Sequence, residues 1–164
     1  MASTYASNTG LELIRNGEQS GTWGTTTNNN LNIIDRLTNG VLSISLAGAN
    51  SYTLTTGNGN LTEGQHKVIV LTGSPSGAVT FTIAPNTNEH IYFFYNQTNA
   101  QVTVTQGSGA NVVIPAVASS AGVNIVYCDG AGAGAAVTSL TNNLAMDNVS
   151  ITGGTVAGIT DLAL

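Results

Sequence analysis

Residues 79–95, VTFTIAPNTNEHIYFFY, contain two runs of β-forming side chains separated by a turn rich in proline and asparagine. Valine, isoleucine, threonine and aromatic residues favour strands, and a period of two gives a strand two distinct faces. Further short runs of this kind occur at residues 41–46, 52–55, 67–71, 102–105, 112–114 and 123–127. Evenly spaced strands with no helical pattern among them predict a mainly β protein with an antiparallel β-sandwich or jelly-roll-like body.

The order of these patterns divides the chain into three segments. Residues 1–40 are expected to form an attachment arm and a helix, and residues 41–129 the β-sandwich body. Residues 130–164 begin as a linker rich in Gly and Ala and continue as short apolar couplets between glycines. Such an extended β tail cannot build a core of its own, so we expect copies from several chains to intertwine.

Only one helix is expected, and it lies near the N-terminus. Leu31, Ile34, Leu37 and Val41 recur at spacings of three, three and four residues, which is typical of one face of a helix. Residues 25–28 offer capping hydroxyls and amides, and Gly40 suits the left-handed position after the last turn. Because Asn and Thr are weak helix formers, this helix should depend on tertiary or intersubunit packing.

Charged side chains are scarce: they make up 7% of the 164 residues, and the net charge is −5. A chain with this composition lacks the cluster of basic residues that binding to nucleic acid or to an anionic membrane requires. The sequence contains no run of about 18 apolar residues, the length that a membrane-spanning helix needs. Its N-terminus lacks the basic and apolar regions of a signal peptide. Few charges and a mean hydropathy of +0.16 favour self-association.

Candidate catalytic and metal-binding residues are few. Cys128 could act as a nucleophile with His66 or His90 as its base, as in a small hydrolase, but no third orienting residue accompanies them. His66 and His90 lie near Glu63 and Glu89, which could form a metal site if subunits brought copies together on an axis. A strand-end thiol and solvated His–Glu pairs are the favoured interpretations, so we expect no enzyme, cofactor or metal.

Two further patterns have a functional and a structural interpretation. Glycines at positions 130, 132 and 134 follow a strand, as in a dinucleotide-binding fingerprint, but no βαβ unit surrounds them and a linker is favoured. Alternation places Tyr92 and Phe94 on one face of their strand and Phe93 and Tyr95 on the other. Tyr92 or Tyr95 could stack on a host glycan, although packing between sheets or subunits is favoured.

The segment NGEQSGTWG at residues 16–24 leads into NNNLN at residues 28–32. This combination resembles the N-terminal region of tail-fibre-like virion proteins of tailed phages, especially marine ones. The stretch VSITGGTVAGITDL at residues 149–162 is similar to linker phrases that join successive segments of such fibres. The resemblance covers both ends of the chain, whereas the middle shares only the β-rich style.

The resemblance implies a homotrimeric virion structural protein, made in the host cytoplasm and assembled onto the phage particle. Its expected role is the particle-attached part of a tail fibre, with a head fibre or capsid-decorating protein, or a host-glycan-binding module, as alternatives. Trp23, Leu31, Ile34 and Leu37 are the expected interface with other virion proteins. Most fibres are longer, so the chain is expected to be a short fibre, a decoration protein or the virion-proximal part of a longer one.

Overall fold

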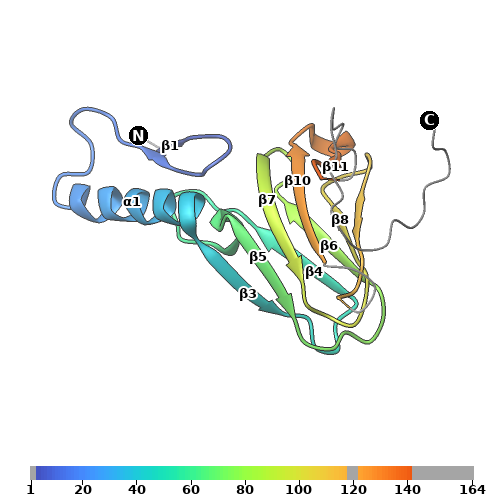
Figure 1. Cartoon of the computed structure of the whole chain (residues 1–164). Coiled ribbons are helices and arrows are strands. Elements are labelled where there is room, and N and C mark those ends of the chain that lie inside the picture. Colours follow the sequence, from blue (N-terminus) through green and yellow to red (C-terminus); the bar gives the residue numbers. More distant parts are fainter. Residues whose placement is uncertain (1–2, 118–121, 142–164) are drawn as a thin grey trace, which may run out of the picture.

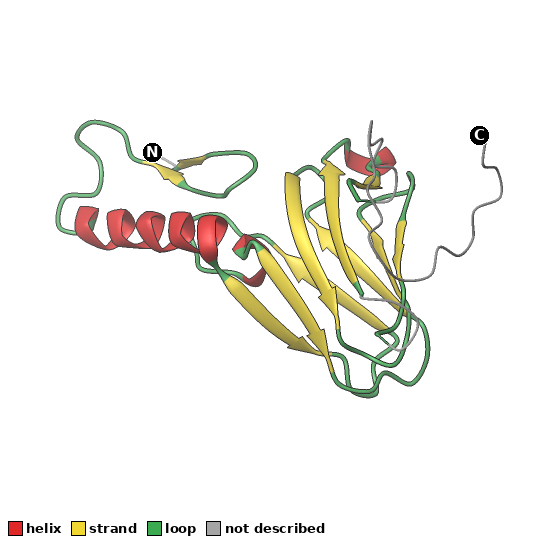
Figure 2. Cartoon of the chain, in the orientation of Figure 1, coloured by secondary structure: helices red, strands yellow, loops and turns green. Residues whose placement is uncertain are grey.

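Two β-sheets pack face to face in the computed structural model, which describes residues 3–117 and 122–141 (Figure 1). Their strands are β3 (Val41–Ser45), β4 (Ser51–Thr55), β5 (Val68–Thr72), β6 (Val79–Ala84), β7 (Glu89–Asn96), β8 (Val102–Thr105), β9 (Val112–Ile114), β10 (Val123–Asp129) and β11 (Val137–Ser139). The five-stranded sheet has the order β11-β10-β7-β5-β3, and the four-stranded sheet the order β4-β6-β8-β9. The prediction of a mainly β protein with an N-terminal α-helix is confirmed (Figure 2).

The chain alternates between the two sheets along β3 to β8. β3, β5 and β7 lie parallel in one sheet, and β4, β6 and β8 lie parallel in the other. The remaining pairs, β8–β9, β7–β10 and β10–β11, are antiparallel. The predicted antiparallel, jelly-roll-like arrangement is therefore wrong for β3 to β8. Their connections arch from one sheet to the other, whereas a short hairpin turn returns the chain within one sheet.

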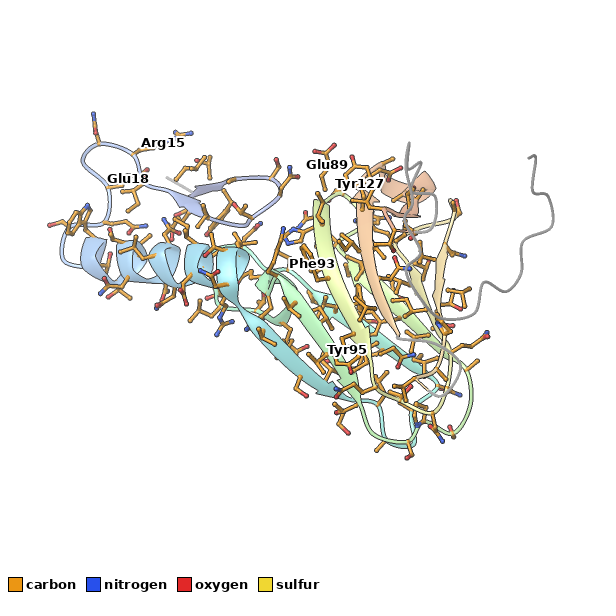
Figure 3. The ribbon with its side chains drawn as sticks, in the orientation of Figure 1. Arg15, Glu18, Glu89, Phe93, Tyr95 and Tyr127 are labelled. Carbon is orange, nitrogen blue, oxygen red and sulfur yellow. The ribbon has the colours of Figure 1, made fainter. Side chains whose placement is uncertain are left out.

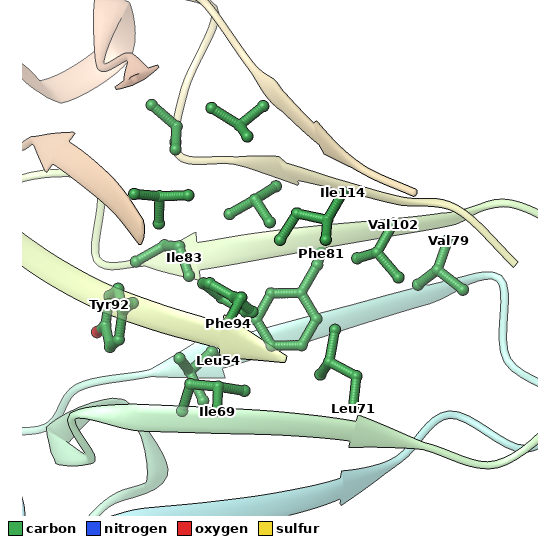
Figure 4. Packing of buried hydrophobic residues seen from close by; sticks show 14 of the residues in the cluster. Leu54, Ile69, Leu71, Val79, Phe81, Ile83, Tyr92, Phe94, Val102 and Ile114 are labelled. Carbon is green, nitrogen blue, oxygen red and sulfur yellow. The ribbon is translucent and has the colours of Figure 1, made fainter. Parts of the chain in front are cut away.

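The core lies between the inner faces of the two sheets (Figure 4). Phe81 of β6 is fully buried and meets Phe94 of β7 edge to face, with ring centroids 5.3 Å apart. Tyr52 of β4 stacks on Phe81 from the neighbouring strand of the same sheet, with ring centroids 5.2 Å apart. Aromatic contacts of this geometry add to the free energy gained by burying apolar area, so the contact between Phe81 and Phe94 helps to hold the two sheets together.

Buried amide side chains fasten the connections at the ends of the strands. The Asn96 amide group donates to the carbonyls of Ala100 and Pro115, each at 2.9 Å, and its oxygen accepts from the Thr98 backbone at 3.0 Å. Gln106 likewise donates to the Asn88 carbonyl at 2.7 Å. These bonds satisfy backbone groups that the irregular connections would otherwise leave unpaired.

The helix α1 (Trp23–Asn39) stands out from one end of the sandwich, and the N-terminal arm lies along it (Figure 1). The arm contains a two-stranded hairpin of β1 (Thr4–Tyr5) and β2 (Glu12–Leu13). Asn30 of α1 accepts from the Glu12 N–H at 3.0 Å and donates to the Glu12 carbonyl at 2.8 Å. The asparagine-rich helix thus has the tertiary contacts that its weak propensity requires.

The two ends of α1 differ from the sequence-based expectation. The helix begins at Trp23, and Thr22 at the N-cap makes no side-chain capping bond. Gly40 has an extended backbone, with φ −66° and ψ 130°, so the predicted left-handed conformation is wrong. A Cβ at Gly40 would lie 2.5 Å from the Arg36 carbonyl oxygen. Glycine is needed here because the backbones approach closely, not because φ is positive.

Residues 130–141 fold back onto the body as a short 3-10 turn, Gly132–Gly134, followed by β11 at the edge of the five-stranded sheet. Strand pairing thus continues beyond the predicted body boundary at residue 129. The predicted C-terminal fibre tail lies mostly outside the described residues, which end at residue 141. Within the described part of the chain, no helix is both long and apolar enough to cross a membrane.

Replacing Asn96 by Leu should lower the free energy of unfolding by about 2–4 kcal/mol, because several buried backbone groups lose their partner. Chemical denaturation monitored by circular dichroism measures the change. The matched variant Asn111→Leu, at an exposed position, should stay within about 0.5 kcal/mol of the parent. Equal effects of both substitutions would contradict a structural role for the buried amide.

Candidate interaction surface

One side of α1 presents large apolar side chains to solvent. Trp23, Leu31 and Ile34 are 62%, 58% and 44% exposed. Leu31 and Ile34 lie three residues apart, and Thr27 and Thr38 extend the same face at spacings of four, so the side chains form one stripe. Exposed apolar surface of this kind is unfavourable in water unless a partner covers it.

A neighbouring side of α1 is already covered. Ile33 is fully buried, Thr26 is 9% exposed, and Asn30 bonds to the arm. Leu37 is half-buried. Of the four interface residues predicted from the sequence, Trp23, Leu31 and Ile34 therefore share the exposed stripe, whereas Leu37 faces the junction between helix and body. That the four form an interface stays a prediction.

The outer face of the five-stranded sheet is also apolar (Figure 3). Ile91, Phe93 and Tyr95 alternate outward along β7 and are 39%, 37% and 36% exposed. On the adjacent strand β10, Val123 pairs with Tyr95 and is 57% exposed, and Tyr127 pairs with Ile91. No role for most of this surface was predicted from the sequence. One sequence feature does indicate an apolar outer face. In IYFFY both odd and even positions carry large apolar side chains, whereas in VTFTI every second residue is threonine.

A pocket of about 380 Å³ lies where the helix, the arm and this outer face meet. Asn8 at the tip of the arm closes one side, accepting from the Glu89 backbone at 3.3 Å. Lys67 lies with its Nζ 5.6 Å from the centre of the Phe93 ring. The lining residues are Asn8, Thr9, Leu37, Lys67, Glu89, His90, Ile91 and Tyr127. The pocket is therefore continuous with the apolar sheet face through Ile91 and Tyr127.

The two tyrosines considered for glycan stacking have different surroundings. Tyr92 is 1% exposed and its hydroxyl donates to the Gly64 carbonyl at 2.7 Å, so its ring cannot stack on a sugar. The proposed use of Tyr92 as a glycan platform is therefore wrong: even positions of β7 face the core. Tyr95 is on the outer face, where the paired residues Val70 and Val123 are aliphatic. Such neighbours offer no hydrogen bonds to sugar hydroxyls.

The sheet register places Cys128 directly opposite His90, an arrangement that the sequence could not show. Burial raises the pKa of Cys128 to about 12, and the nearby Asp129 carboxylate adds to the shift. Burial lowers the pKa of His90 to about 4, and Lys67 contributes by repelling the imidazolium. Because both groups are held in their neutral forms, the pair is poorly suited to nucleophilic catalysis, which requires a thiolate.

The other chemical candidates also have structural surroundings. The His66 Nδ1–H donates to the Glu63 carbonyl at 2.9 Å. No group of three or more His, Cys, Asp or Glu side chains converges within residues 3–117 and 122–141. The glycine-rich turn after β10 leads into a 3-10 turn and β11 where a dinucleotide-binding unit would have a helix. Asp129 accepts from two backbone amides of this turn.

Comparison with protein-family models, curated proteins and solved structures finds no match for this chain.

The half-buried His90 should make stability depend on pH. Its pKa in the folded protein, about 4, is below the ordinary value of 6.5, so the unfolded chain binds the proton more tightly. Stability should therefore fall as the pH drops below 6.5, by about 2 kcal/mol between pH 7 and pH 5. Urea denaturation at fixed protein concentration measures this loss. The slope should largely disappear in His90→Asn, and a slope that persists would contradict the assignment.

Cys128 should be protected from alkylation in the folded protein. It is fully buried, and its raised pKa leaves little thiolate at pH 8. We expect iodoacetamide to react with Cys128 at least about a hundredfold more slowly in the folded protein than in the denatured chain. Mass spectrometry of the labelled protein over time measures the two rates. Rapid labelling of the folded chain would instead indicate an accessible and activated thiol.

Proposed function

We propose that this chain is a structural protein of a tailed-bacteriophage particle, namely the particle-attached part of a tail fibre. The observation that carries the proposal is the exposed apolar stripe on α1, an element that stands out from the sandwich (Figure 1). The stripe lies directly after the residue 16–24 segment that resembles the N-terminal region of tail-fibre-like virion proteins. In this proposal the stripe docks onto another protein of the tail.

Attachment through this stripe would rely on shape and apolar burial. Trp23 is an effective anchor because a tryptophan removes a large area from water when it enters a pocket. Leu31 and Ile34 would extend the contact along the helix. The neighbouring side of α1 is held by the arm and the body, so the stripe is presented on a supported helix and little ordering entropy is lost on binding.

A homotrimer is part of the proposal. Oligomers commonly have closed symmetry, and repeated weak attachment points gain avidity when they bind together. The low charge of the chain, 7% of residues, means that little electrostatic repulsion opposes such association.

A head fibre or a capsid-decorating protein would use the same kind of anchor and is the nearest alternative. Imaging the particle with this chain located distinguishes the tail from the head. Glycan binding is less well supported, since Tyr92 is buried and Tyr95 lies among aliphatic side chains. A glycan-array signal that disappears in Tyr95→Ala would revive that alternative.

The anchor can be tested with Trp23→Ala and with Leu31→Asp. Both variants should keep the circular dichroism spectrum of the sandwich yet reduce the amount of the protein in purified particles at least about tenfold, as measured by quantitative mass spectrometry. Val113→Asp is the matched control, because Val113 is 49% exposed on the other sheet. Normal incorporation of the two stripe variants would contradict the proposed anchor.

A further inference from the structure

The outer face of the five-stranded sheet carries three apolar rows that cross the strands. Register places Val41, Val68, Phe93 and Ile125 in one row. Val70, Tyr95 and Val123 form a second row, which ends at Ser43 of β3, and Ile91 pairs with Tyr127 in a third, which ends at Thr138 of β11. These side chains point away from the core, since the alternate positions of β7 and β10 are the buried ones.

Charge is confined to one end of this face. Glu89 and Asp129 lie opposite each other in the register at the end of β7 and β10 that meets the pocket. Lys67 lies close by, with its Nζ over the Phe93 ring. The three apolar rows themselves contain no charged side chain. An uncharged centre with charged groups at the margin is the composition of protein–protein interfaces, which are depleted of charge at their core.

The size of the face can be compared with what a stable interface needs. Val41 and Val123 are 62% and 57% exposed, and the three outward residues of β7 are each more than a third exposed. Together with the half-buried members of the rows, the face exposes on the order of 500 Å² of apolar surface, which is comparable to the largest apolar patch on a typical soluble monomer, a patch that is often functional. A stable interface takes roughly 800 Å² from each partner, so this face can supply most of one side.

From these observations we infer that copies of this chain associate through the outer face of the five-stranded sheet. The inference rests on the proposed function only in that a trimeric appendage needs such a contact. Other copies of the chain suit the face because sheets pack well against sheets, and in a trimer the three outer faces would enclose the threefold axis. The partner surface must also be nearly free of charge, as this chain is. The margin carries both signs, Lys67 beside Glu89 and Asp129, so neighbouring copies can pair charges there.

Other occupants fit less well. A glycan would leave its hydroxyls unpaired against aliphatic side chains. An anionic membrane would require basic residues around the face, where only Lys67 accompanies two carboxylates. The stripe on α1 lies on a different element, so tail attachment and self-association can occupy separate surfaces.

The test uses the full chain and static light scattering after gel filtration. The parent should have about three times the monomer mass of 16.6 kDa. Val123→Asp should shift it to the monomer mass, because a buried carboxylate without a partner is strongly unfavourable. Val113→Asp, at a valine of similar exposure on β9, should keep the parent mass. A folded Val123→Asp that keeps the parent mass would overturn the inference.

A milder substitution guards against loss of folding. Val123→Cys should react with a maleimide at least about tenfold more slowly than Val113→Cys when the protein is assembled, because the contact between copies covers residue 123. The native Cys128 is buried and contributes little to the labelling. Equal rates in an oligomeric sample would overturn the inference. If Leu31→Asp but not Val123→Asp dissociates the oligomer, the helix joins the copies and only the sheet inference fails. If the parent itself is a monomer, the trimer in the proposed function fails as well.

Discussion

The edge-to-face contact between Phe81 and Phe94 is the interaction on which the rest of the structure depends. It joins the two sheets through side chains that are both fully buried, and the inner residues of the neighbouring strands pack around it. Because side chains alternate along a strand, fixing the inner residues also fixes which residues face outward. The apolar outer face of β7 is therefore a direct result of how the core is packed, and so is the burial of Tyr92.

The period-two patterns were sufficient to place the strands of the body, because half-buried strands impose that period on their side chains. They could not show which strand pairs with which. An alternating strand has the same sequence signature whether the chain then turns back within its sheet or crosses to the opposite one, and the structure takes the second course from β3 to β8. The helix was likewise predictable, but at its start the Trp23 N–H donates to the Gln19 carbonyl in the preceding loop, and at its end the extended Gly40 accepts from Lys67 and Val68, which are distant in the sequence.

The candidate site divides in the same way. Spacing alone placed Leu31 and Ile34 on one helix face, and both are exposed there. The outer sheet face was missed because its members come from strands far apart in the sequence and meet only through the register. Tyr92 was misassigned because an apolar run with rings at both parities does not reveal which face is buried. The proximity of Cys128 to His90 is also a property of the register, and burial shifts the pKa of each group in the direction that favours its neutral form.

The parallel stacking of strands has a consequence for the dimensions of the molecule. Val41 pairs with Val68 and Val68 with Phe93, so successive coils of the chain are 27 and 25 residues apart in register. Each coil adds one strand to each sheet and widens both sheets by about 4.8 Å. A coil is thus a repeating unit. The first coil contains β3 and β4, and each of these strands is at the edge of its sheet. Gain or loss of one such unit would change the width of both sheets in discrete steps of about 4.8 Å.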